Sequence, residues 1–456
     1  MKKMKIYWID LFCGAGGTSS GIHFSNTNTE VLACVNHDVN AIASHKANHP
    51  NALHFTEDIR DFKVVAKLKK IVQELRLKQP NCIINLWASL ECTNFSNAKG
   101  GQQRDADSRS LAEHMYMYLE AINPNYFWVE NVREFMSWGP LCENKKPISK
   151  LAGRDFVKWM EKVESFGYIS EKKILNAADF GACQKRKRLF IQFAKPDLGI
   201  SWAKPTHSES CNDGLIKWNP VKKALDFNIE GKSIFQRKKP LSTNTIKRIL
   251  AGCKKFIAKG ENGFTKQYNS GNDFQRVKSF NEPIGTVTTN NRFAVVTTHL
   301  NTYYGKSGLH SIDSPSPTIT TNDRIAKIDA FILNPSWFGN SGSINKPCCT
   351  IVARQDKAPL YLITSEKGNL QAPIYDVDCE NTIELKKFML KHNISDIKLR
   401  MLVIPELKKI QGFPDNYILI GNQKEQKKQI GNAVEVNQAK ALVEDNYNSL
   451  YKKLVA

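Results

Sequence analysis

The chain has 456 residues, of which 41% are apolar, and carries a formal net charge of +21 from 65 Lys and Arg against 44 Asp and Glu. A surplus of this size predicts strong positive potential on at least one face, which makes nucleic acid the first partner to consider. No stretch reaches the roughly 18 consecutive apolar residues of a membrane span, and the eleven cysteines, scattered without a Cys-x-x-Cys pair, argue against a disulfide framework or a zinc site and for a reducing cytoplasm.

Short apolar runs alternate with helix-like stretches through the first 200 or so residues. The start of the chain is basic and then apolar, but it contains Asp10 and leads into a glycine-rich turn, so it predicts a buried strand rather than a signal peptide. The stretch 64–78 has helical spacing. This alternation predicts an α/β fold with a doubly wound, mostly parallel sheet. The expected strands are 7–12, 30–36, 82–89, 126–132 and 188–194.

From about residue 206 to 395 the chain is rich in Thr, Asn, Ser, Gly and Pro with short strand-like runs, which predicts a second, β-rich domain. A repeat runs through it, because "PIGTVTTNNR", "PSPTITTNDR" and "PCCTIVARQD" begin at Pro283, Pro315 and Pro347, 32 residues apart both times. Three copies at one period indicate a repeated supersecondary unit, although Thr-rich strands can also resemble one another by chance. The final stretch 431–454 has helical spacing and is expected to pack on the first domain.

The segment "DLFCGAGGTSSG" (10–21) follows the first expected strand. Its glycines permit a tight turn and a close backbone approach, which a nucleotide-like cofactor requires. The next expected strand ends in "NHD" (36–38), and "EDIRDF" (57–62) lies further along. Because an open α/β sheet binds ligands at the carboxyl ends of its strands, these segments predict one cofactor site.

Together with "LECTNFS" (90–96), these segments resemble the C5-cytosine DNA methyltransferase family, and the match follows the whole order of that family's motifs. The remaining motifs are "ENV" (130–132), "NAADFGACQKRKRLF" (176–190), "PTHS" (205–208), "RML" with "PELKKIQGFP" (400–414) and "GNAV" (431–434). The resemblance implies a Rossmann-like fold and S-adenosylmethionine as cofactor. The residues it implies at the cofactor are Phe12, Gly14, Ala15, Gly16, Gly17, Asn36, His37, Asp58, Ile59, Asn432 and Ala433.

The chemistry of methylation accounts for the residue types in these motifs. Carbon 5 of cytosine becomes nucleophilic enough to take a methyl group when a thiolate adds at carbon 6, and Cys92 would be that thiolate. A carboxylic acid at the N3/N4 edge makes the ring more electrophilic, which is the role implied for Glu130. A cation on O2 stabilises developing charge, which suits Arg188, with Arg186 nearby. In duplex DNA the base must leave the stack to reach these groups.

Three positions depart from the family pattern. Pro usually precedes the nucleophilic cysteine and Gln follows it, where this chain has Glu91 and Thr93. Asn36 stands where an acidic residue is expected on the cofactor ribose. A neighbouring carboxylate disfavours the Cys92 thiolate, an effect that the arginines offset. Three roles stay open for Glu91: it faces solvent or pairs with a nearby Lys or Arg, it lines the base pocket, or it silences the enzyme.

We therefore expect an enzyme that methylates carbon 5 of cytosine in a specific double-stranded DNA sequence, with a catalytic domain (1–205), a target-recognition domain (206–395) and a C-terminal segment (396–456) that returns to the first. We expect a cytoplasmic monomer without bound metal, acting as the modification part of a restriction-modification system, with a separately encoded endonuclease, or as an orphan methylase. The alternatives are action on structured RNA or an atypical pyrimidine, and a catalytically impaired DNA-binding homologue. The residues expected at the substrate or DNA are Glu91, Ser96, Gln184, Arg292 and Arg324, the last two in turns that are equally well ordinary hairpins.

Overall fold

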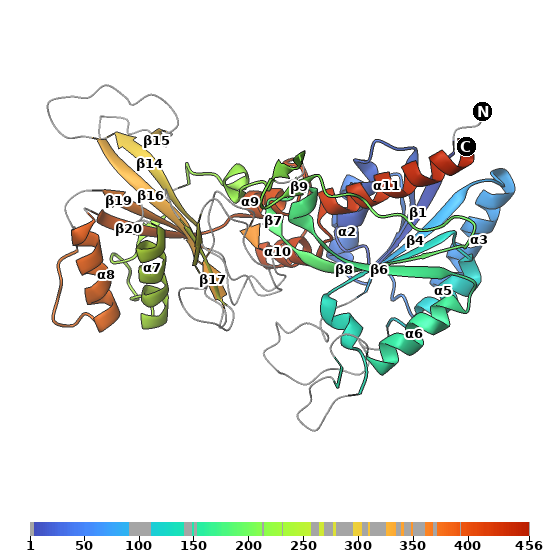
Figure 1. Ribbon diagram of the computed structural model, residues 1–456, viewed down its shortest axis with the longest axis horizontal. Helices are drawn as coiled ribbons and strands as arrows, with labels where there is room; N and C mark the ends of the chain where they lie inside the picture. Colours follow the sequence, from blue (N-terminus) through green and yellow to red (C-terminus); the bar gives the residue numbers. More distant parts are fainter. Residues whose placement is uncertain are drawn as a thin grey trace. The chain divides into compact units, whose positions relative to one another are not determined.

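The computed structural model describes residues 4–90, 111–140, 148–149, 153–211, 214–229, 231–256, 372–392 and 394–455, together with the backbone of eight strands between 264 and 367 (Figure 1). The chain divides into two compact units, the first comprising 1–180, 187–206 and 416–456 and the second comprising 181–186 and 207–415. Residues 396–415, which we expected with the first domain, belong to the second unit, because their strand is hydrogen-bonded inside that unit's sheet.

A seven-stranded sheet with the order β3-β2-β1-β4-β5-β8-β6 forms the centre of the first unit. Strands β1 to β5 pair in parallel, whereas β8 runs antiparallel to its neighbours β5 and β6. The predicted α/β class and mostly parallel sheet are confirmed. Two strands escaped prediction, since β3 is very short and β6 is a largely exposed edge strand without an apolar run. The strands are β1 Ile6–Leu11, β2 Thr29–Val35, β3 Leu53–Phe55, β4 Ile83–Ser89, β5 Tyr126–Asn131, β6 Ile169–Asn176 and β8 Lys187–Ala194.

Helices cover both faces of this sheet (Figure 1). One face packs against α3 Phe62–Lys78, α5 Met115–Ile122 and α6 Arg154–Glu164. The other packs against α1 Gly17–His23, α2 Val39–Asn48 and α11 Val436–Val455. Because strand side chains alternate between faces, Tyr7 and Ile9 enter the first layer while Ile6 and Trp8 enter the second. Both faces of β1 are therefore buried, which explains why the strand is apolar at every position except Asp10.

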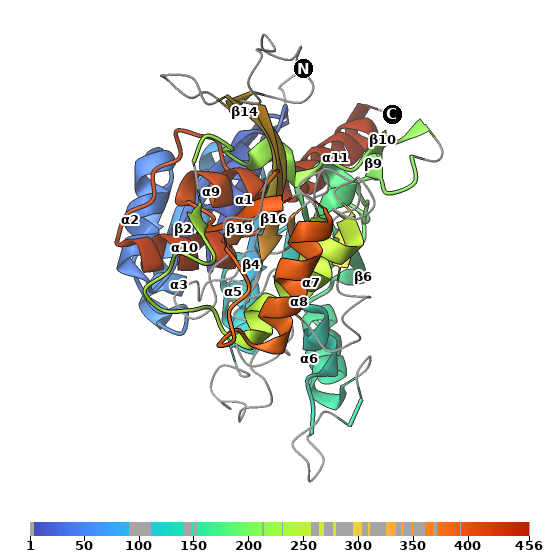
Figure 2. The same cartoon turned by 90° about the vertical axis from the view of Figure 1, so that its left-hand side faces the viewer.

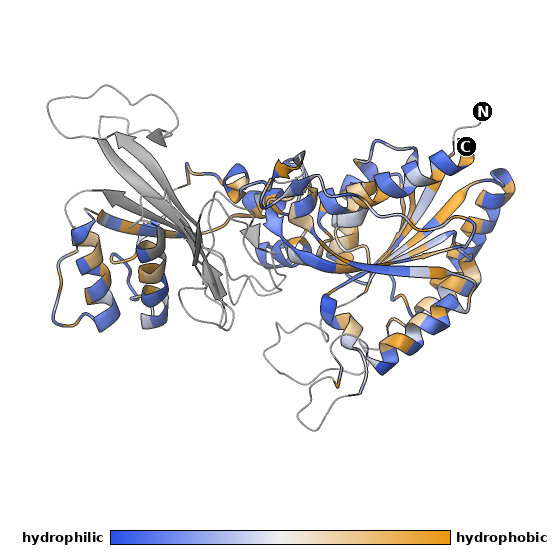
Figure 3. Ribbon diagram, in the orientation of Figure 1, coloured by the Kyte–Doolittle hydropathy of each residue, from blue (hydrophilic) through white to orange (hydrophobic). Residues whose placement is uncertain are grey.

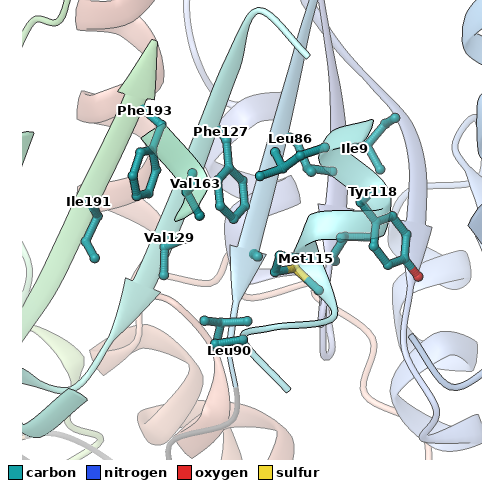
Figure 4. Close-up of a cluster of buried hydrophobic side chains, with 14 of the residues drawn as sticks. Ile9, Leu86, Leu90, Met115, Tyr118, Phe127, Val129, Val163, Ile191 and Phe193 are labelled. Atoms are coloured by element: carbon teal, nitrogen blue, oxygen red, sulfur yellow. The ribbon is translucent and has the colours of Figure 1, made fainter. Parts of the chain in front are cut away.

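The first of these layers is a close-packed apolar core (Figure 4). Phe127 and Phe193, from β5 and β8, stack with ring centroids 5.4 Å apart and lie near Leu86 of β4. Helix α6 contributes Phe156, Trp159, Met160 and Val163, whose spacing places all four on one side of the helix. Figure 3 shows the result as apolar colour on the central strands and mixed colour on the surrounding helices.

The C-terminal segment differs from its prediction in one respect. The stretch 431–454 was expected to be one helix, but α10 Gln423–Asn432 ends before α11 begins at Val436. Ala433 adopts an extended conformation between them, with ψ of 146°. At this break the backbone of Val434 and the Cβ of Ala433 pack against Gly17.

The second unit is built on a six-stranded sheet with the order β11-β20-β19-β16-β14-β15. Helices α7 Thr243–Phe256 and α8 Glu380–Lys391 lie side by side (Figure 2). The three prolines of the predicted repeat lie outside the described residues. A long strand nevertheless follows each repeat, and these strands, β14, β16 and β19, are antiparallel neighbours in the sheet. The strands are β11 Lys232–Ser233, β14 Val295–Thr302, β15 Leu309–His310, β16 Ile325–Leu333, β19 Tyr361–Lys367 and β20 Ile394–Met401.

Several shorter elements also belong to the described part of the second unit. Strands β12 Phe264–Tyr268, β13 Val277–Ser279 and β17 Gly339–Ser341 form a small closed set, and β7 Gln184–Lys185 pairs in parallel with β18 Cys348–Cys349. Helix α9 Ile404–Ile410 follows β20. Among all described residues, no helix is long and apolar enough to cross a membrane.

Candidate active site

The glycine loop after β1 is held in an unusual backbone conformation. Phe12 has a φ of 57°, Gly14 of 53° and Gly16 of 98°, all in the left-handed region. Phe12 is half-buried, and its Cβ makes the left-handed conformation sterically unfavourable, whereas glycine adopts it without strain. The loop is tied to β2 by a hydrogen bond from Cys13 N to Val35 O at 3.2 Å. The carboxyl ends of two neighbouring strands are thereby joined.

The three predicted cofactor glycines are glycine for different reasons. A Cβ on Gly14 would meet nothing within 4 Å, so its open side suits the close approach of a ligand. A Cβ on Gly17 would lie 2.3 Å from Val434 O, and one on Gly16 would lie 2.6 Å from the Tyr417 hydroxyl. Internal packing therefore requires glycine at these two positions. Only Gly14 shows the feature expected of direct contact with a cofactor.

The ends of β2 and β3 bring the other predicted cofactor residues to the same edge of the sheet. Asn36 is half-buried, and its Oδ1 accepts a hydrogen bond from Asp38 N at 2.8 Å, while His37 is exposed. Asp58 accepts hydrogen bonds from its neighbour Arg60, which lower the pKa of Asp58 to about 2. Buried Ile59 accepts a hydrogen bond through its carbonyl from Tyr118, at 2.7 Å. The Asp58 carboxylate is therefore ionised and held in place at neutral pH.

The C-terminal segment completes this site. Ala433 is buried against the glycine loop, where a Cβ on Gly17 would come within 3.1 Å of its own Cβ. Asn432, at the end of α10, is exposed. Tyr417, which sequence reasoning missed, donates a hydrogen bond to the carbonyl oxygen of Ala15. No motif marks Tyr417, so only its contact reveals that it supports the loop.

Glu130 lies at the carboxyl end of β5, directly beside the end of β4. Ser89 and Glu130 are register partners in this parallel pair. The following residue, Asn131, is buried and donates from Nδ2 to Leu90 O at 3.4 Å. The chain thus enters the predicted nucleophile segment from a fixed position two residues before Cys92. Cys92, Glu91 and Ser96 themselves lie outside the described residues.

Glu130 and Arg188 form an ion pair in the interior of the first unit. Arg188 Nε lies 3.3 Å from Glu130 Oε1, and the side chains are only 11% and 9% exposed. This contact lacks hydrogen-bond geometry, and among the described residues Glu130 Oε1 has no hydrogen-bond donor. Arg188 is oriented from its other side by a bond from Nη1 to Lys187 O at 2.9 Å. Two of the four predicted catalytic residues are therefore in contact.

The remaining predicted site residues belong to the second unit or are not described. Gln184 is buried and donates from Nε2 to Gln411 Oε1 at 2.8 Å, which links two of the motifs. Arg186 is also buried in that unit. Arg292 and Arg324 lie outside the described residues.

The "RML" and "PELKK" motifs have a structural role in the second unit. Arg400 donates to both carboxylate oxygens of Glu406, at 2.8 and 3.0 Å, and the pair is buried. Glu406 also accepts from Asp226 N at 2.9 Å. Bidentate geometry with an additional backbone donor is the arrangement in which a buried ion pair is stable.

Comparison with known proteins identifies the family of this chain. The family model described as C-5 cytosine-specific DNA methylase matches residues 6–448. The chain belongs to this family. Members of the family use S-adenosylmethionine, and the open side of Gly14 and the fixed carboxylate of Asp58 fit such a cofactor.

Individual relatives are distant. The type II methyltransferase M.AgeI of Thalassovita gelatinovora is 29% identical over 209 residues, which is 46% of this chain and 44% of that protein. DNA (cytosine-5)-methyltransferase 2 of Arabidopsis thaliana is 25% identical over 99% of this chain and 29% of its own length. The matched stretches therefore span less than half of these relatives. A DNMT2 variant of Spodoptera frugiperda, 14% identical, matches with a TM-score of 0.50 over 98% of this chain and 99% of that one, which supports the fold alone.

Proposed function

We propose that this chain transfers a methyl group from S-adenosylmethionine to carbon 5 of cytosine in a specific double-stranded DNA sequence. Cys92 adds to carbon 6 of a base that has left the helix, and Glu130 binds the N3/N4 edge of that base. Arg188 stabilises the charge that develops on the ring, with Arg186 as a second cation. S-adenosylmethionine, when bound, supplies the methyl group as a sulfonium electrophile.

The buried Glu130–Arg188 pair is the observation that carries this proposal. A carboxyl group is seldom buried at a strand end unless it is paired or used. Here it has one cationic partner, and its Oε1 has no hydrogen-bond donor among the described residues, so it can still bond to a ligand. The strand beside it leads within three residues to Cys92. A nucleophile and an acid at adjoining strand ends suit chemistry on a ring held between them.

The cofactor is proposed to bind at the carboxyl ends of β1 to β3. Gly14 permits its close approach, Phe12 covers the adenine face, and the ionised Asp58 accepts a hydrogen bond from the adenine amino group. Asn36 meets the ribose hydroxyls with an amide in place of the acidic group expected there, so it bonds without adding charge.

The second unit, with its broad antiparallel sheet, is proposed to recognise the target sequence. Arg292 and Arg324, in the turns expected from the repeat, would contact base edges or phosphates, and the net charge of +21 suits a polyanionic partner. We propose a monomer that modifies DNA either with a companion endonuclease or as an orphan enzyme. Substitution of Arg292 should relax sequence preference or reduce the salt dependence of binding, and unchanged values of both would refute that contact.

A covalent trap tests the chemistry. Duplex DNA with 5-fluorocytosine at the target should form a stable adduct with the wild-type chain in the presence of S-adenosylmethionine, because elimination at carbon 5 is blocked. Cys92→Ser should form none and should release no 5-methylcytosine by nucleoside mass spectrometry. Cys379→Ser is the matched control, since Cys379 is an exposed thiol whose pKa is lowered by its hydrogen bond to Thr382.

The same assay separates the alternatives. Adducts and methylation on structured RNA but not on DNA would move the substrate to RNA, and a product other than 5-methylcytosine would indicate an atypical pyrimidine. DNA binding without an adduct would indicate an impaired homologue. Methylation by Cys92→Ser would refute the proposed nucleophile.

A further inference from the structure

A cluster of thiols and imidazoles is buried beneath the glycine loop, on the sheet face that also packs against α1 and α2. Cys34 and His45 have no exposed surface, and Cys13 is 6% exposed. His54 lies half-buried beside them. These four residues come from four separate parts of the first unit: the turn after β1, strand β2, helix α2 and strand β3.

The fold brings the four together through strand register and helix packing. Cys34 and His54 are register partners in the parallel pair of β2 and β3, so their side chains leave the sheet on the same face. Helix α2 covers this face and directs His45 toward it. Cys13 follows β1, which pairs with β2 on its other side.

The distances between their side-chain atoms suit one small cation. Ligand atoms of Cys13, Cys34 and His45 all lie within 4.8 Å of one another. Cys34 Sγ is 3.6 Å from His45 Nδ1, which in turn is 3.0 Å from His54 Nε2. A tetrahedral zinc ion with Zn–S of about 2.3 Å and Zn–N of about 2.0–2.1 Å separates its ligand atoms by about 3.3–3.8 Å. Cys13, Cys34 and His45 are therefore close enough to share one zinc ion after small side-chain shifts, and His54, beside His45, is the candidate for the fourth ligand.

The outer hydrogen bonds of His45 match those of a metal ligand. Ser19 donates to Asp10 Oδ2 at 2.8 Å, and its Oγ lies 2.9 Å from His45 Nε2. In the tautomer that carries its proton on Nε2, His45 donates to Ser19 and the lone pair of Nδ1 faces Cys34. Metal-binding histidines are typically held in this way by a second hydrogen bond.

The donor types fit a metal ion. Cysteine binds metal as the thiolate. Two buried sulfur donors beside two imidazoles form a set that the positive charge of a cation would stabilise.

We propose that Cys13, Cys34, His45 and His54 bind one Zn²⁺ ion. Two sulfur and two nitrogen donors in tetrahedral geometry favour zinc over harder cations such as magnesium. With four protein ligands the site is closed, so the ion has a structural role. It connects the glycine loop to β2 two residues before Asn36, and thus stabilises the loops at which the cofactor is proposed to bind. The sequence argument against zinc rested on the absence of a Cys-x-x-Cys pair, and this site uses none.

Metal content of the full-length chain tests the proposal. Protein prepared with Zn²⁺ and freed of unbound metal should contain one zinc ion per chain by native mass spectrometry and elemental analysis. Cys34→Ala and His45→Ala should contain none, whereas Cys82→Ala, which removes a buried thiol outside the cluster, should retain the ion. Ser19→Ala should keep the stoichiometry at high zinc but weaken affinity about 10–100-fold, as loss of an outer hydrogen bond does.

Cobalt substitution keeps the test decisive where a ligand variant fails to fold. Wild-type chain loaded with Co²⁺ should show the intense visible bands of tetrahedral cobalt and a near-ultraviolet thiolate-to-cobalt band, and both should disappear on addition of Zn²⁺. Three results would overturn the proposal: a wild-type chain that binds no zinc, zinc retained in full by Cys34→Ala, or a Cys13–Cys34 disulfide, seen as a mass lower by two hydrogens, in freshly prepared protein. Each readout is independent of methyl transfer.

Discussion

Alanine in place of Gly17 should destabilise the first unit because there is no room for a methyl group. Its Cβ would lie 2.3 Å from Val434 O and 2.9 Å from Val434 N, and both are backbone atoms that no side-chain rotation can move. Reaching an ordinary contact of about 3.4 Å requires a shift of about 1 Å in the segment between α10 and α11. Overpacking of this kind costs up to about 3 kcal/mol, and the better helix propensity of alanine returns up to about 1 kcal/mol. We expect a net loss of about 2 kcal/mol.

Urea unfolding followed by tryptophan fluorescence measures this loss in the first unit, where Trp87 and Trp128 stack with centroids 5.5 Å apart. Gly14→Ala is the control, because its Cβ would meet nothing within 4 Å and only the left-handed φ of 53° opposes it, at a cost of about 1 kcal/mol. Gly14→Ala should instead weaken binding of S-adenosylmethionine in a calorimetric titration. If Gly17→Ala were as stable as wild type, the described packing of Val434 on the glycine loop would be incorrect.

Three further predictions concern charged groups of the proposed site. Arg188→Ala leaves the Glu130 carboxylate buried without its cation and should lower the unfolding free energy by about 3 kcal/mol. This is the lower end for a buried pair, because the 3.3 Å contact is not a hydrogen bond. A double variant with Glu130→Gln should recover part of the loss, and purely additive effects of the two substitutions would disprove the coupling. The pKa of Asp58 is lowered to about 2, so the contribution of this carboxylate to the stability of the fold is complete above about pH 4 and disappears as pH falls toward 2. Asp58→Asn should make the loss of unfolding free energy between pH 4 and pH 2 slightly smaller, and only slightly because the side chain is 44% exposed. An unchanged loss would refute the pairing with Arg60. Glu91→Pro and Glu91→Gln should both retain 5-methylcytosine as product with modest rate changes, and a different modified base from wild type, or activity gained only on substitution, would show that Glu91 faces the base.

Much of the first unit could be predicted from local patterns. Runs such as "YWIDLF" and "YFWVEN" are mostly apolar because both faces of their strands are buried, and this property is visible in any short window of sequence. Asp10, Glu130 and Asn131 are the polar exceptions. The edge strand β6 has no apolar run by which it could be predicted, because most of its residues are exposed and polar. The 32-residue repeat was also visible locally, although its prolines lie outside the described residues.

The candidate site divides in a similar way. Motif order identified Glu130 and Arg188 separately, but their contact depends on the antiparallel pairing of β8 with β5, which no local window contains. Only glycine fits at position 17 because the backbone of Val434, more than 400 residues away in the chain, occupies the space that a Cβ would need.

The sequence by itself determined five of the seven strands of the first sheet and the chemical types at the strand ends, because these follow from periodicity and composition over a few residues. Tertiary structure alone decided which of those groups meet. Cys34 faces His54 because of the register between β2 and β3, and His45 joins them through the packing of α2 on the sheet. Such contacts are set by strand register and helix packing over long separations, and neither leaves a periodic signal in the sequence.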